Sequence, residues 1–173
     1  MGAAMSAATK SKAKGGKFER EIAKSLSIWL FNDPHILKRE PTSGAQKVQH
    51  YVGDVVPVAP IRWSSFPFLI EGKNGYKDNI PTFNNQKMLR QWLTKLLSER
   101  TEQQCICWLI VRYHGRAPLI ITDTPFNFYS PLTINIQDSG NTIPFHVYEM
   151  RDLLKYNFYE LYKDNYLLME IFE

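Results

Sequence analysis

Phe68-Leu69-Ile70-Glu71-Gly72-Lys73 is a short apolar run that ends in a carboxylate and an amine two positions apart. In a β-strand, neighbouring side chains project to opposite faces, so Glu71 and Lys73 share one face while Phe68 and Ile70 share the other. Burying an acid and a base costs free energy unless the two groups are paired or bind a ligand. We therefore predict a buried strand whose charged end forms a functional site.

A second carboxylate precedes this strand in the sequence. Asp54 follows Gly53 in the predicted strand 51–56, and sixteen residues separate it from Glu71. Gly53 would allow another backbone or a ligand to approach Asp54 closely. We predict that the two strands form a hairpin, which would place Asp54 beside Glu71. The pattern Asp-(16 residues)-Glu-Gly-Lys is the one expected of a divalent-metal nuclease.

A third carboxylate lies in the helix predicted over residues 17–31, which ends before Asn32-Asp33-Pro34. At about 100° per residue, Glu19 falls within the apolar arc of this helix and Glu21 falls outside it. The arc spans roughly 140° and contains Phe18, Ile22, Ala23, Leu26, Trp29 and Leu30. A carboxylate in a buried stripe indicates an ion pair or a bound metal. The alternative is that Glu19 is solvated in the first turn, where the helix dipole stabilises it.

The rest of the chain predicts a mixture of helices and strands in a single domain over residues 15–173. The predicted strands cover residues 36–39, 105–113, 118–122, 132–136 and 145–148, and the predicted helices cover residues 86–99 and 150–162. The strand 105–113 is apolar throughout, as expected of a central strand buried on both faces. The apolar segment 166–172 is expected to pack back on the body of the domain.

Charge and composition restrict the partners and the location of the protein. All of the excess positive charge lies in residues 1–50, which carry nine Lys and Arg against four Asp and Glu, whereas residues 51–173 carry twelve against thirteen. This asymmetry suits a polyanion, and residues 1–14 are expected to form a disordered basic tail. No apolar run is long enough to cross a membrane, and Cys105 and Cys107 are expected to be reduced thiols. We expect a cytoplasmic protein without a small-molecule cofactor.

The predicted site suits Mg²⁺, with Mn²⁺ as a substitute. Hard divalent cations prefer oxygen ligands, which Asp54, Glu71 and the backbone carbonyl of Gly72 could supply. Glu19 could bind an outer water or a second ion. Lys73 could orient or deprotonate the attacking water and hold the scissile phosphate.

These motifs resemble those of the PD-(D/E)xK nucleases, and among them the archaeal- and phage-type Holliday junction resolvases. The segment Lys14-Gly15-Gly16-Lys17-Phe18-Glu19-Arg20-Glu21 is similar to the N-terminal helix motif of that family, Lys-Gly-x-x-x-Glu-Arg-Glu. The resemblance covers residues 14–122 and implies an α/β fold with an αβββαβ core, in which helices flank a mixed sheet. It departs from the family at Gly72, where a larger residue is usual, so we expect a pliable strand end.

The resemblance implies that Glu19 is an active-site acid, that Arg20 contacts the substrate and that Arg39 is the basic residue after the first strand. It further implies a homodimer that resolves four-way junctions in branched DNA by paired nicks. The alternatives are a restriction-like or repair nuclease, or a DNA-binding module without activity. Residues expected to contact DNA are Lys14, Lys17, Arg20, Lys38, Arg39, Thr42 and Ser43, although 38–43 could equally be a plain surface segment. Phe126, Phe128 and Tyr129 are candidates for the dimer interface.

Overall fold

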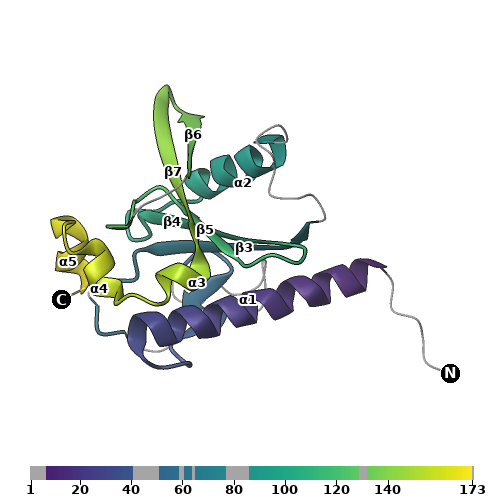
Figure 1. Ribbon diagram of the computed structural model, residues 1–173, viewed down its shortest axis with the longest axis horizontal. Helices are drawn as coiled ribbons and strands as arrows, with labels where there is room; N and C mark the ends of the chain where they lie inside the picture. The colour runs from purple at the N-terminus through teal and green to yellow at the C-terminus, as the bar shows by residue number, and fades with distance from the viewer. Residues whose placement is uncertain are drawn as a thin grey trace.

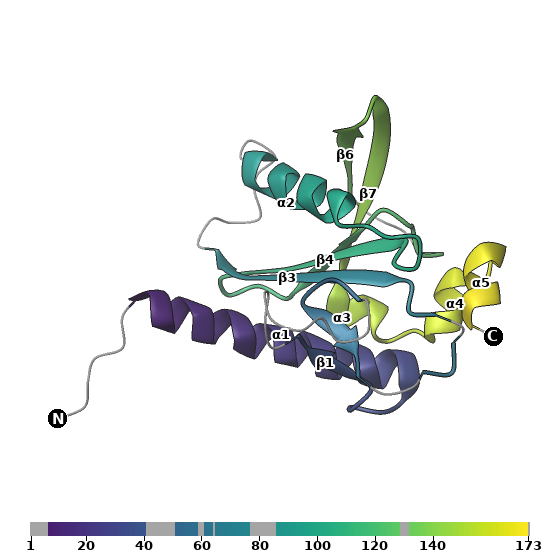
Figure 2. The same cartoon turned by 180° about the vertical axis from the view of Figure 1, so that it is seen from behind.

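A mixed β-sheet lies between helices α1 and α2 in the computed structural model (Figure 1, Figure 2). The structure describes residues 7–40, 51–58, 61–63, 65–76, 86–128 and 132–172. The order helix, three strands, helix, strand from α1 to β4 confirms the expected αβββαβ core. In chain order the elements are α1 (Ala7–Phe31), β1 (Leu37–Arg39), β2 (Val55–Pro57), β3 (Phe68–Tyr76), α2 (Gln86–Ser98), β4 (Ile106–Tyr113), β5 (Leu119–Thr122), β6 (Leu132–Asp138), β7 (Asn141–Glu149), α3 (Met150–Leu153), α4 (Phe158–Tyr162) and α5 (Tyr166–Phe172).

The main sheet has five strands in the order β3-β4-β5-β7-β6. Strands β3 and β4 are parallel, and α2 lies in the crossover connection that such a pair requires. The other neighbours are antiparallel, and β4 and β5 form a hairpin. Strands β1 and β2 form a separate antiparallel pair. Strand β3 is therefore at one edge of the main sheet.

The alternation of side chains along β3 divides them between two hydrophobic cores. Phe68 and Ile70 are buried in the core beneath α1, whereas Leu69 is buried in the core beneath α2. The ring of Trp108 in β4 stacks on Phe68, with 4.1 Å between the ring centroids. In α5, Phe172 packs against Trp63 with 4.6 Å between centroids, so this segment does return to the body of the domain. These contacts confirm the predicted strand with two differently buried faces.

The predicted hairpin between the strand of Asp54 and the strand of Glu71 is wrong. Strand β2 pairs with β1, and Gly53 instead forms a parallel bridge with Ile70 of β3. Gly53 has φ of 109°, and a Cβ on it would lie 2.7 Å from the Ile70 carbonyl oxygen. The close backbone approach expected at this glycine is thus confirmed, but it is made with β3 running in the same direction. Asp54 thus reaches the edge of β3 through a parallel contact.

Two predicted helix boundaries are also corrected by the structure. Helix α1 begins at Ala7 rather than at Lys17, so residues 7–14 of the expected tail are helical. The single helix expected over 150–162 is two helices, α3 and α4, because the chain becomes extended at Asn157. The Asn157 side chain accepts a hydrogen bond from the Tyr159 N–H at 2.9 Å. An asparagine in this position caps a new helix. Among the described residues, no helix is both long and apolar enough to span a membrane.

Candidate active site

Two backbone hydrogen bonds attach Asp54 to the edge of β3. The Asp54 N–H donates to the Ile70 carbonyl at 2.8 Å, and the Gly72 N–H donates to Asp54 Oδ2 at 2.9 Å. The first bond fixes the backbone of Asp54, and the second fixes its carboxylate. The conformation of Gly53 makes both possible, since a residue with a Cβ would collide with the Ile70 carbonyl.

Glu71 and Lys73 form an ion pair on one face of β3, as the alternation of the strand predicts. Their side chains are only 14% and 22% exposed, respectively, so the pair is largely shielded from water. Both residues lie where β3 pairs with the centre of β4, opposite Leu109 and Val111. The strand therefore holds an acid and an amine in a fixed register beside Asp54.

Glu19 approaches the same strand from the other face, where α1 crosses Gly72. A Cβ on Gly72 would lie 3.5 Å from Glu19 Cγ, 3.7 Å from Asp54 Oδ2 and 3.3 Å from Ile22 Cδ1. The space that a larger side chain would occupy is thus bordered by two of the predicted acids. Gly72 stays within the regular pairing of β3 with Ile110 of β4, so the absence of a side chain brings α1 close to the strand.

An ion pair between Glu19 and Arg39 joins α1 to the end of β1. The sequence motifs indicated both residues but did not predict that they pair. Gly16 makes room for this contact, because a Cβ at that position would lie 3.2 Å from Arg39 Cζ. Glycine is unfavourable within a helix, so Gly15 and Gly16 in the N-terminal helix motif were the sequence signal that another side chain packs closely against this turn. Glu19 is 16% exposed on its side chain, which confirms its place in the buried stripe.

The carboxylates of this site repel one another. Burial is the main cause that raises the pKa of Asp54 from 3.8 to about 7, and the negative charge of Glu71 adds to it. Glu19 raises this pKa further, while the Gly72 N–H and the Lys73 ammonium act in the opposite direction. At neutral pH the protein therefore holds an acid that is costly to ionise. Such a group is typical of a site that binds a cation or moves a proton.

This pKa shift predicts that Asp54 destabilises the apoprotein as the pH rises. Between pH 4 and pH 7 the folded state binds more protons at Asp54 than the unfolded state does, so the free energy of unfolding falls with increasing pH. Asp54→Asn removes this loss while retaining an oxygen that accepts the Gly72 hydrogen bond. Relative to wild type, we expect the variant to gain stability on the order of a few kcal/mol between pH 4 and pH 8.

Thermal unfolding of both proteins in chelator, across this pH range, measures the effect. Asp152→Asn is a suitable control, because Asp152 is an exposed carboxylate that pairs with Lys155 and whose pKa is lowered. A stability difference between wild type and Asp54→Asn that stays constant with pH would contradict the prediction.

The structure brings together most of the residues that the sequence selected. The candidate site lies at the edge of β3, where Glu19 and Asp54 meet Glu71, Gly72 and Lys73 of the strand. Arg39 contacts this group through its ion pair with Glu19. The side chains of Lys14, Lys17, Arg20 and Lys38 are exposed, while Thr42 and Ser43 lie outside the described residues. Lys14 lies over β3 beyond the acids, since its Nζ would be 2.7 Å from a Cβ on Gly75.

Sequence reasoning gave no role to Glu40, the residue after β1. Its N–H donates to the Asp54 carbonyl at 2.9 Å. Both of its carboxylate oxygens are buried and, as far as the structure is described, accept no hydrogen bond. Buried polar groups in proteins are nearly always satisfied. The unpaired oxygens of Glu40 would be stabilised by positive charge close to the backbone of Asp54.

Comparison with protein families agrees with this arrangement. The model of the family described as "Phage putative PDDEXK endonuclease" matches residues 10–164. The match extends well past residue 122, so the hairpin of β6 and β7 and helices α3 and α4 fall within the family region as well. Comparisons with curated proteins and with solved structures give no significant match. The match covers most of the chain and includes every residue of the site described above, and the protein therefore belongs to this PDDEXK endonuclease family, within the PD-(D/E)xK nucleases.

Proposed function

We propose that this protein is a metal-dependent endonuclease that hydrolyses phosphodiesters in branched DNA and resolves four-way junctions by paired nicks. The observation that supports this most directly is the environment of Asp54, which is buried against β3 beside Glu71, with Lys73 on the same strand. The finer assignment to four-way junctions rests on the resemblance of the N-terminal helix motif.

The donor set at the edge of β3 fits a hard divalent cation, Mg²⁺ or in its place Mn²⁺. As far as the structure is described, no three His, Cys, Asp or Glu side chains converge as a metal-binding group. Mg²⁺ does not require them, because it keeps several waters and binds through one or two carboxylates. Asp54, Glu71 and the Gly72 carbonyl would hold the ion, and Glu19 would hold its outer water. When bound, the metal would lower the pKa of a water and neutralise charge on the phosphate.

The protein's own groups would position the substrate and the nucleophile. The Lys73 ammonium would hold a non-bridging oxygen of the scissile phosphate and orient the attacking water, because it lies beside Glu71 on the same face of the strand. The Gly72 N–H holds the Asp54 carboxylate in one orientation. Arg39, held beside Glu19, would place a guanidinium next to the phosphate backbone of the bound strand.

A two-fold symmetric dimer would cut the two strands of a junction symmetrically. Of the residues suggested for the dimer interface, Phe126 is buried in the core, so that suggestion is wrong. Tyr129 lies outside the described residues. Phe128 remains a candidate, since it is 37% exposed and packs on Tyr156, which is also exposed, with 5.0 Å between centroids.

A side-by-side assay tests the proposal. We expect wild type to nick a four-way junction symmetrically with Mg²⁺ or Mn²⁺, to cut linear duplex and single strands far more slowly, and to be inactive in chelator. Glu71→Gln is the inactive control. Equal cleavage of linear duplex would favour the restriction-like or repair nuclease. Binding without cleavage of every substrate would favour the binding module, and nicking that survives the chelator would exclude the metal-dependent reaction.

A further inference from the structure

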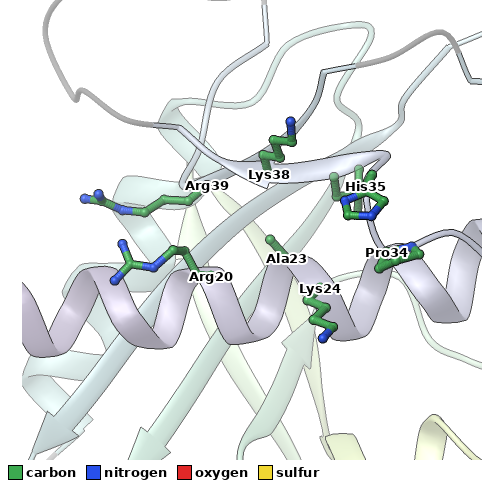
Figure 3. A pocket seen from close by; sticks show the side chains of 8 residues that line it. Arg20, Ala23, Lys24, Pro34, His35, Lys38 and Arg39 are labelled. Carbon is green, nitrogen blue, oxygen red and sulfur yellow. The ribbon is translucent and has the colours of Figure 1, made fainter.

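A groove with a volume of about 560 Å³ runs between α1 and β1 (Figure 3). Arg20 and Lys24 line it from the helix, and His35, Lys38 and Arg39 line it from the opposite side. Figure 3 shows that Arg20 and Arg39 extend in the same direction from these facing elements. The groove is therefore bounded on both sides by nitrogen-bearing side chains.

The positive charge of this groove is not balanced by acids. Among the described residues that line it, none is a carboxylate. Arg39 is paired with Glu19, but Arg20, Lys24 and Lys38 make no ion pair within the part of the chain that the structure describes. Arg20 and Lys24 are also four residues apart on one helix, a spacing at which like charges repel each other. A charged surface that is unfavourable in the free protein suits a polyanionic ligand.

The combination of apolar and cationic side chains in the groove favours a nucleic acid over other polyanions. Ala23 and Leu37 lie at its base between the charged side chains, so its base is apolar while its rims are cationic. The sugar–phosphate backbone of a nucleic acid has this pattern, with apolar sugar edges between charged phosphates. Lys17 continues the row on α1, since at about 100° per residue it falls within roughly 60° of Arg20 and Lys24. From position 17 to position 24 the helix rises about 10 Å, which equals the axial rise of about three base pairs of B-DNA at about 3.4 Å each.

The groove opens beside the candidate active site. Arg39 belongs to both, because it lines the groove and pairs with Glu19, which like Asp54 borders Gly72. A strand lying in the groove would thus continue directly to the acids. We propose that the α1–β1 groove binds the DNA backbone next to the scissile phosphate, with Lys24, His35 and Lys38 as non-catalytic anchors. This inference rests on the proposed nuclease function. It adds Lys24 and His35 to the DNA contacts expected from the sequence and places them in one groove with Lys38.

The double variant Lys24→Gln/Lys38→Gln tests this proposal by equilibrium binding. Wild type and variants are titrated with a labelled four-way junction in chelator, over a series of KCl concentrations. Each lost phosphate contact should reduce the slope of log K against log[KCl] by about 0.7–0.9, so we expect a reduction of about 1.4–1.8 and weaker binding of about tenfold or more at low salt. Lys24→Arg/Lys38→Arg should retain the wild-type slope.

Lys95→Gln/Lys163→Gln is the matched control, because it removes the same charge from two exposed lysines outside the groove. An unchanged slope in the groove variant, or the same loss in the control, would overturn the proposal. Competition by poly-glutamate as effective as that by DNA, through the same two lysines, would assign the groove to an acidic polypeptide. Cleavage by wild type with Mg²⁺ is measured separately, so a failure of the groove leaves the nuclease proposal intact.

Discussion

Asp54→Asn is expected to reduce DNA cleavage by roughly a thousandfold or more while leaving the protein folded. The substitution keeps the shape of the side chain and its hydrogen bond from the Gly72 N–H, but it removes the charge that would bind the metal. A metal contributes several kcal/mol of transition-state stabilisation, and each 1.4 kcal/mol corresponds to about a tenfold change in rate. Single-turnover cleavage of a four-way junction in Mg²⁺ measures the loss.

Two further measurements separate this effect from a change in folding or in DNA binding. In chelator the variant should unfold at a higher temperature than wild type at pH 8, because it lacks the costly carboxylate, and Mg²⁺ should stabilise only wild type. DNA affinity in chelator should be retained or slightly increased, since one negative charge is removed. An Asp54→Asn protein with full activity would exclude Asp54 from the site.

Lys73→Gln is expected to lower the rate of the chemical step by about 10²–10⁴-fold, the usual contribution of a positioned proton-transfer group. Lys73 is 22% exposed and pairs with Glu71, so its ammonium is held close to the predicted metal ligands. Glutamine retains the length of the side chain and a hydrogen-bond donor but not the charge. Single-turnover rates at saturating protein separate the loss in catalysis from any loss in binding.

The matched control is Lys95→Gln, which removes an exposed lysine that pairs with Glu99 on the surface of α2. It should retain the wild-type rate within about twofold, because isolated surface ion pairs contribute little. If Lys73→Gln weakens junction binding in chelator but cleaves at the wild-type rate once bound, Lys73 would be a binding residue. The proposed role in orienting the nucleophile would then be wrong.

The Glu19–Arg39 ion pair connects the α1–β1 groove to the acids of the site. Arg39 faces the α1–β1 groove and Glu19 borders Gly72, so a phosphate that attracts the guanidinium would loosen its hold on Glu19. By keeping this pair, the free protein avoids a further uncompensated carboxylate beside Asp54. The order of acids along the sequence carries no sign of such a contact.

Periodicity was enough to predict most of the elements around the site. The alternation of β3 places Glu71 and Lys73 on one face, and the ion pair between them confirms it. The apolar arc of α1 separates Glu19 from Glu21, and the structure agrees, since Glu21 is exposed and pairs with Arg112 on β4. These features depend on residues a few positions apart, whose relative orientation is set by local backbone geometry.

The order of elements around the site, and the choice of Glu19, Asp54 and Glu71 as candidate acids, thus came from the sequence alone. Only the tertiary structure decided that Gly53 pairs in parallel with Ile70, that Gly16 admits Arg39 to Glu19, and that α1 and β1 enclose a cationic groove. Each depends on a contact between segments far apart in the chain. The free energy of such a contact comes from packing, close backbone approach and the burial of charge, and no local pattern specifies which partner satisfies those demands.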